Sequence, residues 1–425
     1  MASEGASHGG AGSGPTRLLA LITPGLLVAA TGVGAGDLAT AAFTASKLGV
    51  AVLWAVVLGA FLKYVMNEGL ARWQLATGET LLEGAMQRLG RPGRYVFGAY
   101  FFLWSFFVGS ALMSACGVAM HAIAPVFPDA ATGKVVFGIA ASLLGVALVL
   151  AGGFGLFEKV MGVCIGIMFA TVLVTAVVLC ESWGAVARGL LIPRIPHAAG
   201  EGVGWTVALM GGVGGTLTVL CYGYWIREKG RSGPGDLRAC RIDLATAYVL
   251  TALFGLAMVV IGSTVQVEGH GAGLVVSLAD KLAEPLGNVG RWAFLLGAFG
   301  AVFSSLLGVW QAVPYIFADF WRLVGPSRET SVDTRGRPYR AYLLAIAFIP
   351  MLGLFFSFRE IQKVYAIFGA LFMPLLAMAL LLLNGRSDWV GHGLRNRPTT
   401  TAILAGTVVL FLYFGYRQLR AQLGA

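Results

Sequence analysis

Asp37 is the side chain of this sequence with the clearest chemical potential, because it lies deep inside the first long apolar stretch. A carboxylate at the centre of a membrane helix costs at least about 2.5–3.5 kcal/mol on insertion scales, so such residues usually face a cavity and a cation. We therefore expect Asp37 to contact a substrate or a coupling ion. The alternative is structural, because Asp is also a preferred N-cap and could cap the helix that follows.

A second set of oxygen donors follows a glycine cluster in the middle of a later apolar stretch. Thr216 and Thr218 supply hydroxyls there and Gly215 supplies a backbone carbonyl, while Gly34 supplies another carbonyl near Asp37. Hydroxyl and carbonyl oxygens are hard ligands suited to Mg²⁺, Ca²⁺ or Na⁺. A threonine hydroxyl can instead bond to a carbonyl of its own helix, so the sequence leaves both roles open.

Further polar side chains within or beside apolar stretches could line a pathway for ions or protons. Ser304 and Ser305 are neighbours in one such stretch, although serine is also a routine helix-packing residue. Glu68, Asp243 and Asp319 could form a proton relay. Such carboxylates more often pair with a nearby arginine and close a gate, and three arginines are available as partners: Arg72, Arg241 and Arg322.

The elements that must position these residues are apolar runs, which make up most of the chain. Of the 425 residues, 57% are hydrophobic and 12% are charged, and the mean hydropathy is +0.80. Soluble domains have about a quarter of their residues charged, whereas runs of about 20 apolar residues match the bilayer thickness. Because such runs form helices in lipid, we predict an all-α integral membrane protein. About eleven spans are expected: 17–46, 50–71, 95–124, 135–153, 158–180, 203–226, 243–266, 291–317, 339–357, 361–383 and 400–418.

The basic residues divide unequally between the loops on the two sides of these spans. Nineteen Lys and Arg residues fall on one side and ten on the other. The richer side should be cytoplasmic, which predicts a cytoplasmic N-terminus and an external C-terminus. Residues 1–16 are expected to form a disordered tail and residues 17–425 a single transmembrane domain. The lack of a targeting signal fits a bacterial inner membrane.

Glycine clusters interrupt two of the expected spans, at 31–37 in the first and at 211–218 in the sixth. The two interruptions are five spans apart, and an odd number of spans returns a repeat upside down. Paired interrupted spans in two inverted halves point to the binding site of a transporter. The predicted repeats are 17–180 and 203–383, with 400–418 as an extra helix. The alternative is that these glycines are faces for close helix packing.

Several other protein classes lack support in the sequence. There is no Walker loop, no His-Glu-x-x-His and no nucleophile elbow, so we predict no enzyme and no cofactor beyond a transported cation and a coupling proton. The net charge of +10 lies in alternate loops rather than on one stripe, which argues against nucleic acid. None of the five cysteines forms a Cys-x-x-Cys pair. The expected partners are the lipid bilayer and the transported species, with no obligate protein partner.

The stretch from Pro24 to Glu83 contains Leu70-Ala71-Arg72 followed by Ala76-Thr77-Gly78. With these motifs the chain resembles the Nramp family of metal-ion transporters, most strongly over its first two spans. The span count, the cytoplasmic N-terminus and the linker before span 6 agree with that family. The resemblance implies a LeuT-type fold in which spans 1–5 and 6–10 are inverted repeats. The residues that carry it are Pro24, Gly25 and Leu26; Leu38, Ala39 and Thr40; Leu53 and Trp54; Leu70, Ala71 and Arg72; Ala76, Thr77 and Gly78; Leu191, Ile192 and Pro193; and Ser304, Ser305 and Gln311.

The metal-binding motifs of that family are altered in this chain. The family's Asp-Pro-Gly-Asn in span 1 corresponds here to Gly34 through Asp37, so the usual Asp is Gly34 and the usual Asn is Asp37. In span 6, Thr218 stands where the family has a Met and Leu220 where it has a His. In span 10, Phe372 stands where a Gln is frequent. Loss of the soft sulfur ligand favours a harder cation.

Three hypotheses follow from these residues. The first is a secondary-active or facilitative carrier that moves a divalent cation, Mg²⁺ or Mn²⁺, by alternating access. Its ligands would be Asp37, Thr218 with Thr216, and the carbonyls of Gly34 and Gly215. The second is a carrier of a small polar or amino-acid-like solute on the same fold. The third is a membrane receptor that transports nothing.

Overall fold

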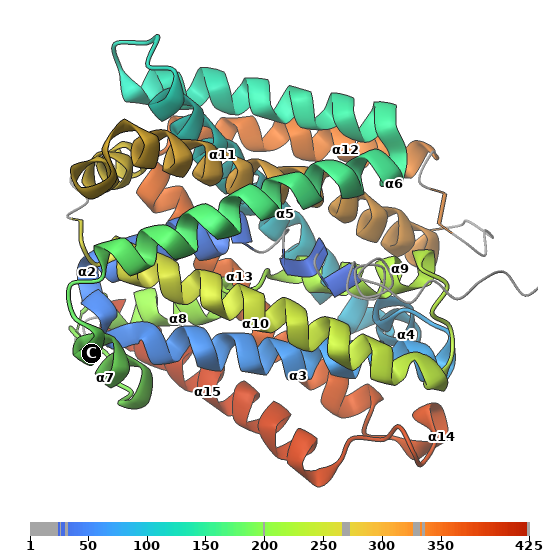
Figure 1. The fold of residues 1–425 in the computed structure, drawn as a ribbon. Coiled ribbons are helices and arrows are strands. Elements are labelled where there is room, and N and C mark those ends of the chain that lie inside the picture. Colours follow the sequence, from blue (N-terminus) through green and yellow to red (C-terminus); the bar gives the residue numbers. More distant parts are fainter. Residues whose placement is uncertain are drawn as a thin grey trace, which may run out of the picture.

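The fold is taken from a computed structural model, which describes residues 24–25, 27–29, 33–198, 200–265, 273–325, 332–333 and 336–422. These residues form helices and the turns between them, as predicted (Figure 1). The predicted N-terminal tail, residues 1–16, lies outside the described residues. So do residues 17–23, 26 and 30 of the first predicted span and residues 31–32 of its predicted interruption. Residues 33–37 of that predicted interruption are helical, because they belong to a π-helix that covers Val33–Thr40.

The helical elements follow one another in a simple order. The α-helices are α2 (Ala41–Leu48), α3 (Leu53–Thr77), α4 (Leu81–Arg88), α5 (Gly90–Ile123), α6 (Ala130–Leu179), α7 (Trp183–Leu191), α8 (Gly202–Gly212), α9 (Cys221–Glu228), α10 (Leu237–Gly262), α11 (Leu274–Val324), α12 (Arg337–Phe348), α13 (Phe358–Leu383), α14 (Ser387–Val390) and α15 (Pro398–Gln422). Shorter elements are a π-helix, η1 (Val33–Thr40), and the 3₁₀ segments η2 (Gly49–Val52), η3 (Leu217–Leu220), η4 (Pro234–Asp236) and η5 (Ile349–Phe355).

Nine helices among the described residues are long and apolar enough to cross a membrane, or ten if a bent pair counts as one span. The first of the nine, Asp37–Thr77, contains the end of predicted span 1 and all of predicted span 2. The bent pair joins Phe169–Leu179 to α7 at 111° and includes the end of predicted span 5. The lower count thus arises where two predicted spans share one helical segment or where a helix bends.

Two helices are longer than the spans predicted for them. Helix α6 includes residues of both predicted spans 4 and 5. Figure 1 shows that it bends sharply, so that its two arms run in opposite directions. Helix α11 includes predicted span 8 and a preceding segment, and the two parts meet at a kink where Gly287 has φ 61° and ψ −160°. A positive φ favours glycine because it has no Cβ.

The short helices α4 and α7 lie outside the predicted spans and mark opposite ends of the bundle (Figure 1). Helix α4 begins with a capping box in which Thr80 and Glu83 satisfy each other's backbone N–H groups. Helix α7 has exposed apolar residues at both ends, since Trp183 is 61% exposed and Leu191 is 80% exposed. Such amphipathic segments suit the membrane–water interface.

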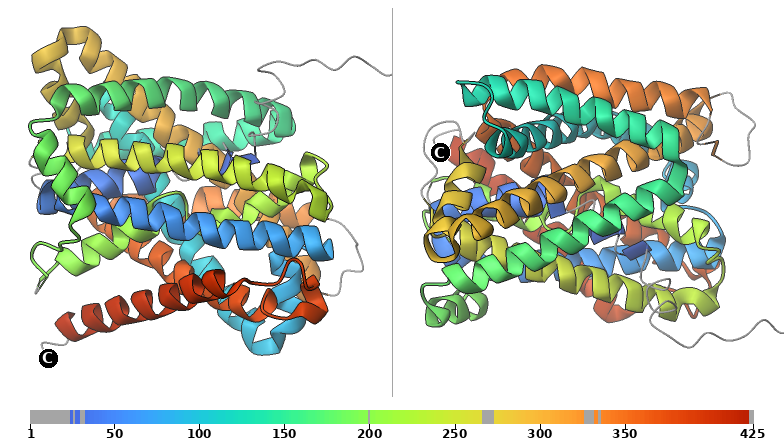
Figure 2. Two further views of the ribbon diagram at one scale, coloured as in Figure 1. Left: turned by 60° about the horizontal axis from the view of Figure 1, so that its bottom comes forward. Right: turned by 45° about the horizontal axis from the view of Figure 1, so that its top comes forward.

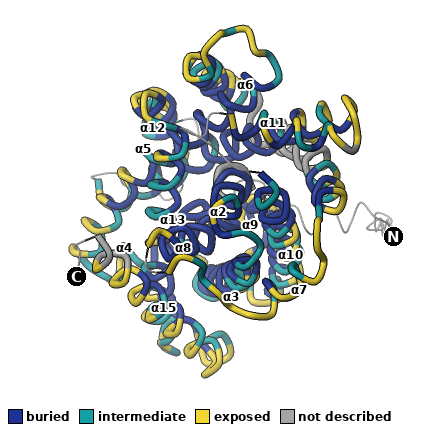
Figure 3. The backbone as a smooth tube through the Cα atoms, turned by 90° about the vertical axis from the view of Figure 1, so that its left-hand side faces the viewer, coloured by how far each residue is buried: buried dark blue, intermediate teal, exposed yellow. Residues whose placement is uncertain are grey.

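The two helices of span 6, α8 and α9, and helix α2 of span 1 lie at the centre of the bundle. In Figure 3, α2, α8 and α9 are surrounded by other helices and are mostly buried, whereas α15 carries exposed residues at the perimeter. Figure 2 shows α15 on the outside in a second view. This arrangement keeps the irregular backbone away from lipid, where its polar groups would lack partners.

Small residues allow the helices to approach closely. Gly117 of α5 packs against α6 so tightly that a Cβ built there would lie 2.0 Å from the carbonyl oxygen of Lys134. A Cβ at Gly59 of α3 would lie 2.7 Å from the carbonyl oxygen of Met210 in α8. Close backbone contact of this kind is typical of helices that pack within a membrane.

The close contact at Gly117 predicts that Gly117→Ala destabilises the protein by about 1–3 kcal/mol, because the added methyl group must push α5 away from α6. The measurement is thermal unfolding in detergent, followed by tryptophan fluorescence. Gly406→Ala is the matched control, because Gly406 of α15 has no atom within 4 Å of a built Cβ. Equal effects of the two substitutions would contradict the packing described here.

Candidate functional site

Span 6 is broken at its predicted glycine cluster. Helix α8 ends at Gly212, and the chain resumes as η3 and α9 after four residues. Within the break, Gly214 and Gly215 have φ values of +74° and +82°, in the left-handed region that side chains with a Cβ rarely adopt. The sequence-based interpretation of an opened helix is therefore correct for span 6. The break exposes backbone carbonyls at the end of α8 that no longer have intrahelical partners.

The ammonium group of Lys63 binds these carbonyls. Its Nζ donates to the carbonyl oxygen of Gly211 at 2.6 Å and also to those of Val213 and Gly215. Lys63 lies in the middle of α3 and is 2% exposed, and α3 packs directly against α8. All three N–H donors of one ammonium are therefore used on the broken end of a neighbouring helix.

Asp37 binds the same break. Its Oδ2 accepts a hydrogen bond of 3.1 Å from the backbone N–H of Gly214, and its side chain is fully buried. Its Oδ1 is buried without a hydrogen-bond partner in the described structure. Asp37 and Lys63 thus both bind the backbone of the break, Lys63 at its carbonyl oxygens and Asp37 at the N–H of Gly214.

The backbone around Asp37 is π-helical rather than the N-terminus of an α-helix. Asp37 is the fifth residue of η1, so the alternative that it caps the following helix is not what the structure shows. π-Helical turns are rare and often occur at functional sites. Gly255 of α10 lies beside the carboxylate, because a Cβ built there would be in van der Waals contact with its Oδ1, at 3.5 Å.

The two threonines of the break are held in different ways. The hydroxyl oxygen of Thr216 accepts a hydrogen bond of 2.9 Å from the indole nitrogen of Trp104 in α5. Thr218 is buried within η3. Among the described residues, no hydrogen bond joins either hydroxyl to Asp37. The hydrogen bonds that Lys63 and Asp37 form in the described structure thus go to the backbone of the break and not to these hydroxyls.

The remaining predicted lining residues lie in η1, which contains Asp37, or in a helix that packs against η1. Gly34 belongs to η1, three residues before Asp37. Ser304 and Ser305 are fully buried in α11, which packs against η1. Ser304 donates to the carbonyl oxygen of Ala301 at 2.9 Å, the bond expected of a serine that serves its own helix.

Glu68 is paired with two of the three arginines anticipated as partners of the candidate relay carboxylates. Its carboxylate accepts from Arg72 at 2.9 Å and from Arg241 at 2.8 Å. Arg72 also donates to the side chain of Asn396 at 2.9 Å, which ties α3 to the segment before α15. This arrangement joins three parts of the bundle at the end where α4 and α14 lie.

The two other candidate relay carboxylates also form ion pairs at this end. Asp319 pairs with Arg322 at 2.6 Å, as anticipated, and also accepts from the hydroxyl of Tyr224 at 2.7 Å. Asp243 pairs with Arg231 at 2.9 Å, an arginine that the sequence did not suggest as its partner. These contacts favour the structural alternative, in which the carboxylates hold helices together, over a proton relay.

The opposite end of the bundle is joined by a second, more exposed cluster. Glu201, just before α8, binds Lys47 at 2.6 Å and Lys363 at 2.5 Å. Hydrogen bonds from Lys363 and Lys47 lower the pKa of Glu201 from 4.5 to about 2. Closer to the break, the side-chain amide of Gln362 donates to the hydroxyl of Thr40 at 3.0 Å.

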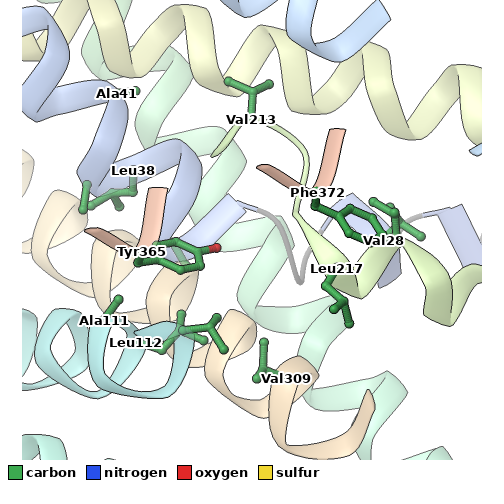
Figure 4. Packing of buried hydrophobic residues seen from close by; sticks show 14 of the residues in the cluster. Val28, Leu38, Ala41, Ala111, Leu112, Val213, Leu217, Val309, Tyr365 and Phe372 are labelled. Atoms are coloured by element: carbon green, nitrogen blue, oxygen red, sulfur yellow. The ribbon is translucent and has the colours of Figure 1, made fainter. Parts of the chain in front are cut away.

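Apolar side chains also lie beside the break. Figure 4 shows Val213 and Leu217 flanking the break and Phe372 contributed by α13. Phe372 and Leu220 line a hydrophobic cavity of about 150 Å³ together with Tyr100. The positions where the resemblance leads one to expect a Gln and a His thus contribute hydrophobic surface.

No group of three or more His, Cys, Asp or Glu side chains that could hold a metal is present among the described residues. The break offers instead one carboxylate, Asp37, and a set of backbone carbonyls. We call this set the carbonyl cage and define it by the carbonyl oxygens of Gly211, Val213 and Gly215. Its oxygens are hard donors that suit a hard cation.

Lys63 is a candidate functional residue that the sequence-based interpretation missed, although a signal was present. Of the 30 Lys and Arg residues in the chain, nineteen belong to one side of the predicted spans and ten to the other. Lys63 is the one that remains, and it lies in the middle of predicted span 50–71. A lysine in the middle of a predicted span is by default a functional candidate whose partner should be sought.

Comparison with known proteins identifies the family. Residues 25–418 match the family model described as Nramp, natural resistance-associated macrophage protein-like. The chain belongs to the Nramp family. The family is one of transporters, which agrees with the prediction that the chain is not an enzyme.

Relatives of this Nramp protein include bacterial proteins named divalent metal cation transporter MntH. The protein from Yersinia enterocolitica is 25% identical over 300 residues, which cover 68% of this chain and 69% of that protein. The protein from Aeromonas hydrophila is 23% identical over 418 residues, which cover 93% of this chain and 94% of that protein.

Solved structures confirm the predicted fold class. A crystal structure of the Eremococcus coleocola manganese transporter has a TM-score of 0.71 at 16% identity, covering 97% of this chain and 88% of that chain. The structure of MhsT with L-phenylalanine has a TM-score of 0.65 at 16% identity, covering 95% and 98% of the two chains. The all-α fold of the LeuT type is thus confirmed.

The cluster around Glu201 predicts a pH dependence of stability. Because the folded-state pKa of Glu201 is below 4.5, its ion pairs stabilise the protein above pH 4.5 and lose this effect as the pH falls toward 2. Glu201→Gln should therefore lower the unfolding temperature at pH 7 slightly, by the equivalent of less than about 1 kcal/mol. The difference from wild type should shrink between pH 4.5 and pH 2.

The measurement is thermal unfolding in detergent over this pH range. Glu181→Gln, at another exposed glutamate, controls for the loss of a carboxylate. A difference between wild type and Glu201→Gln that grows on acidification would contradict the assignment.

Proposed function

We propose that this protein carries a divalent metal cation, Mg²⁺ or Mn²⁺, across the membrane by alternating access. Membership of the Nramp family and the names of the MntH relatives support metal-ion transport. The observation that carries the proposal is the carbonyl cage with Asp37 beside it, because this buried site in the middle of the bundle already holds a positive charge. The comparisons do not favour the alternative of a small-solute carrier.

The ligand chemistry supports a hard cation. Carboxylate and carbonyl oxygens are the donors preferred by Mg²⁺ and are also used by Mn²⁺, whereas thioether sulfur and imidazole select softer metals. Asp37 would supply the negative charge and Gly215 a carbonyl oxygen. Thr216, Thr218 and Gly34 lie in the two interrupted segments and remain predicted ligands.

Two ion-pair clusters suit the gates that alternating access requires. The cluster of Glu68, Arg72 and Arg241 joins the bundle at one end, and Glu201 with its two lysines joins it at the other. The carriage of an ion requires that the two clusters open in turn, because simultaneous opening would make a channel. We assign Glu68 to the gate, since its carboxylate is already bound by two arginines.

The helices and the basic residues also bear on the membrane that holds the protein and on its orientation there. Apolar helices and bacterial MntH relatives support an integral protein of a bacterial plasma membrane. We propose that the end of the bundle with α4 and α14 is cytoplasmic, because it carries the larger set of basic residues. The N-terminus would then be cytoplasmic, and the C-terminus external.

The central test is cation uptake into proteoliposomes that contain wild-type protein or Asp37→Asn. Wild type should take up Mn²⁺ or Mg²⁺, and Asp37→Asn should lower the uptake rate at least about tenfold, because the amide removes the only charge of the ligand set. Asp388→Asn makes the same chemical change at an exposed position in α14 and should transport normally.

Two results of this uptake experiment would overturn the proposed function. No cation flux by wild type, or flux unaffected by Asp37→Asn, would exclude the mechanism. In that case thermal-shift measurements with amino acids would test the small-solute alternative, because a true ligand stabilises the folded protein by mass action.

A further inference from the structure

We propose that Lys63 is a tethered cation that occupies the carbonyl cage between transport events, so that the transported cation must displace its ammonium group in order to bind. This inference rests on the proposed function and names the residue that sets the affinity of the site. Lys63 would then compete with the transported cation for the same carbonyl oxygens.

The contacts of Lys63 are those of a bound cation rather than of a surface lysine. Its ammonium has three N–H donors, and the structure directs one to each of the three carbonyls of the cage. The side chain is 2% exposed, so protein oxygens have replaced its hydration shell. A buried charge without such partners would cost several kcal/mol.

Lys63 and a metal cation cannot share the cage. Metal–oxygen distances are about 2.0–2.6 Å for Mg²⁺ and Ca²⁺, and the Lys63 Nζ already lies 2.6 Å from the carbonyl oxygen of Gly211. A second cation on the same oxygens would overlap the nitrogen and repel its charge. Binding therefore requires that the ammonium withdraws, which the four-carbon stem of lysine allows.

The tethered ammonium also stabilises the empty carrier while its binding site moves from one side of the membrane to the other. With Lys63 in place, the carbonyls of the broken helix are hydrogen-bonded and the charge of Asp37 has an opposite charge nearby. Without it, closing the empty site would bury an uncompensated carboxylate and unpaired carbonyls, at a substantial cost. Lys63 thus lets the empty carrier change sides, which net transport requires.

One other lysine is buried among the described residues, and it does not share this arrangement. Lys134 of α6 is also buried, at 4% exposure, and its Nζ donates to the carbonyl oxygen of Phe356 at 2.6 Å. That carbonyl follows η5, far along the chain from the break. Lys134 therefore serves as a matched control for the removal of a buried lysine–carbonyl bond.

The first test is Mn²⁺ and Mg²⁺ binding to purified full-length protein by isothermal titration calorimetry. Lys63→Met keeps the length of the side chain and removes the competitor, so it should bind the metal at least about tenfold more tightly than wild type. Lys134→Met should bind with wild-type affinity. Loss of a merely structural lysine would weaken binding or leave it unchanged, so a tighter site distinguishes the two roles.

The second test compares net uptake with exchange in proteoliposomes. Lys63→Met should lose most net Mn²⁺ uptake into empty vesicles and retain exchange in vesicles preloaded with Mn²⁺, because only the loaded carrier changes sides. If Lys63→Met does not fold, Lys63→Gln makes the same comparison with a neutral side chain that still donates hydrogen bonds.

The outcomes separate this inference from the proposed function. Unchanged or weaker metal binding by a folded Lys63→Met, while wild type transports Mn²⁺, would overturn the tethered-cation role and leave the function standing. Equal losses of net uptake and exchange would overturn it as well. No metal binding and no flux by wild type or by either Lys63 variant would overturn the proposed function itself.

Discussion

The structure depends on the pairing of backbone polar groups in an environment that offers no water. A continuous helix satisfies its own carbonyls, but α8 ends inside the bundle and leaves several of them free. Lys63 binds three of these carbonyls, and Asp37 accepts from the N–H of Gly214. A broken helix, a buried lysine and a buried carboxylate are therefore mutually dependent, because each would be costly without the other two.

The rest of the fold keeps this polar centre enclosed. Glycines let α3 approach α8 and α5 approach α6 at backbone distance, so that little space remains between the helices. Ion pairs gather at the two ends of the bundle, around Glu68 and around Glu201, and few charges lie between them. Such a division suits a protein that must open at one end while it stays closed at the other.

Some features were predictable because they depend on local composition. The break in span 6 was found correctly from its glycines, since left-handed backbone at Gly214 and Gly215 needs residues without a Cβ. The pairing of Glu68 with Arg72 was foreseeable because residues four apart meet on one helix face. The partner of Asp243 was not, because Arg231 lies in the loop that precedes its helix and returns to it only in the folded chain.

By itself the sequence determined the membrane class, the helical fold and the break in span 6, because hydrophobic runs and glycine clusters act over a few turns of helix. Only the tertiary structure decided what faces the carboxylate of Asp37. Lys63 reaches residues that are about 150 positions away in the chain, from 148 for Gly211 to 152 for Gly215. Contacts over such separations arise from the way whole helices pack, and no local pattern specifies which side chain meets which carbonyl.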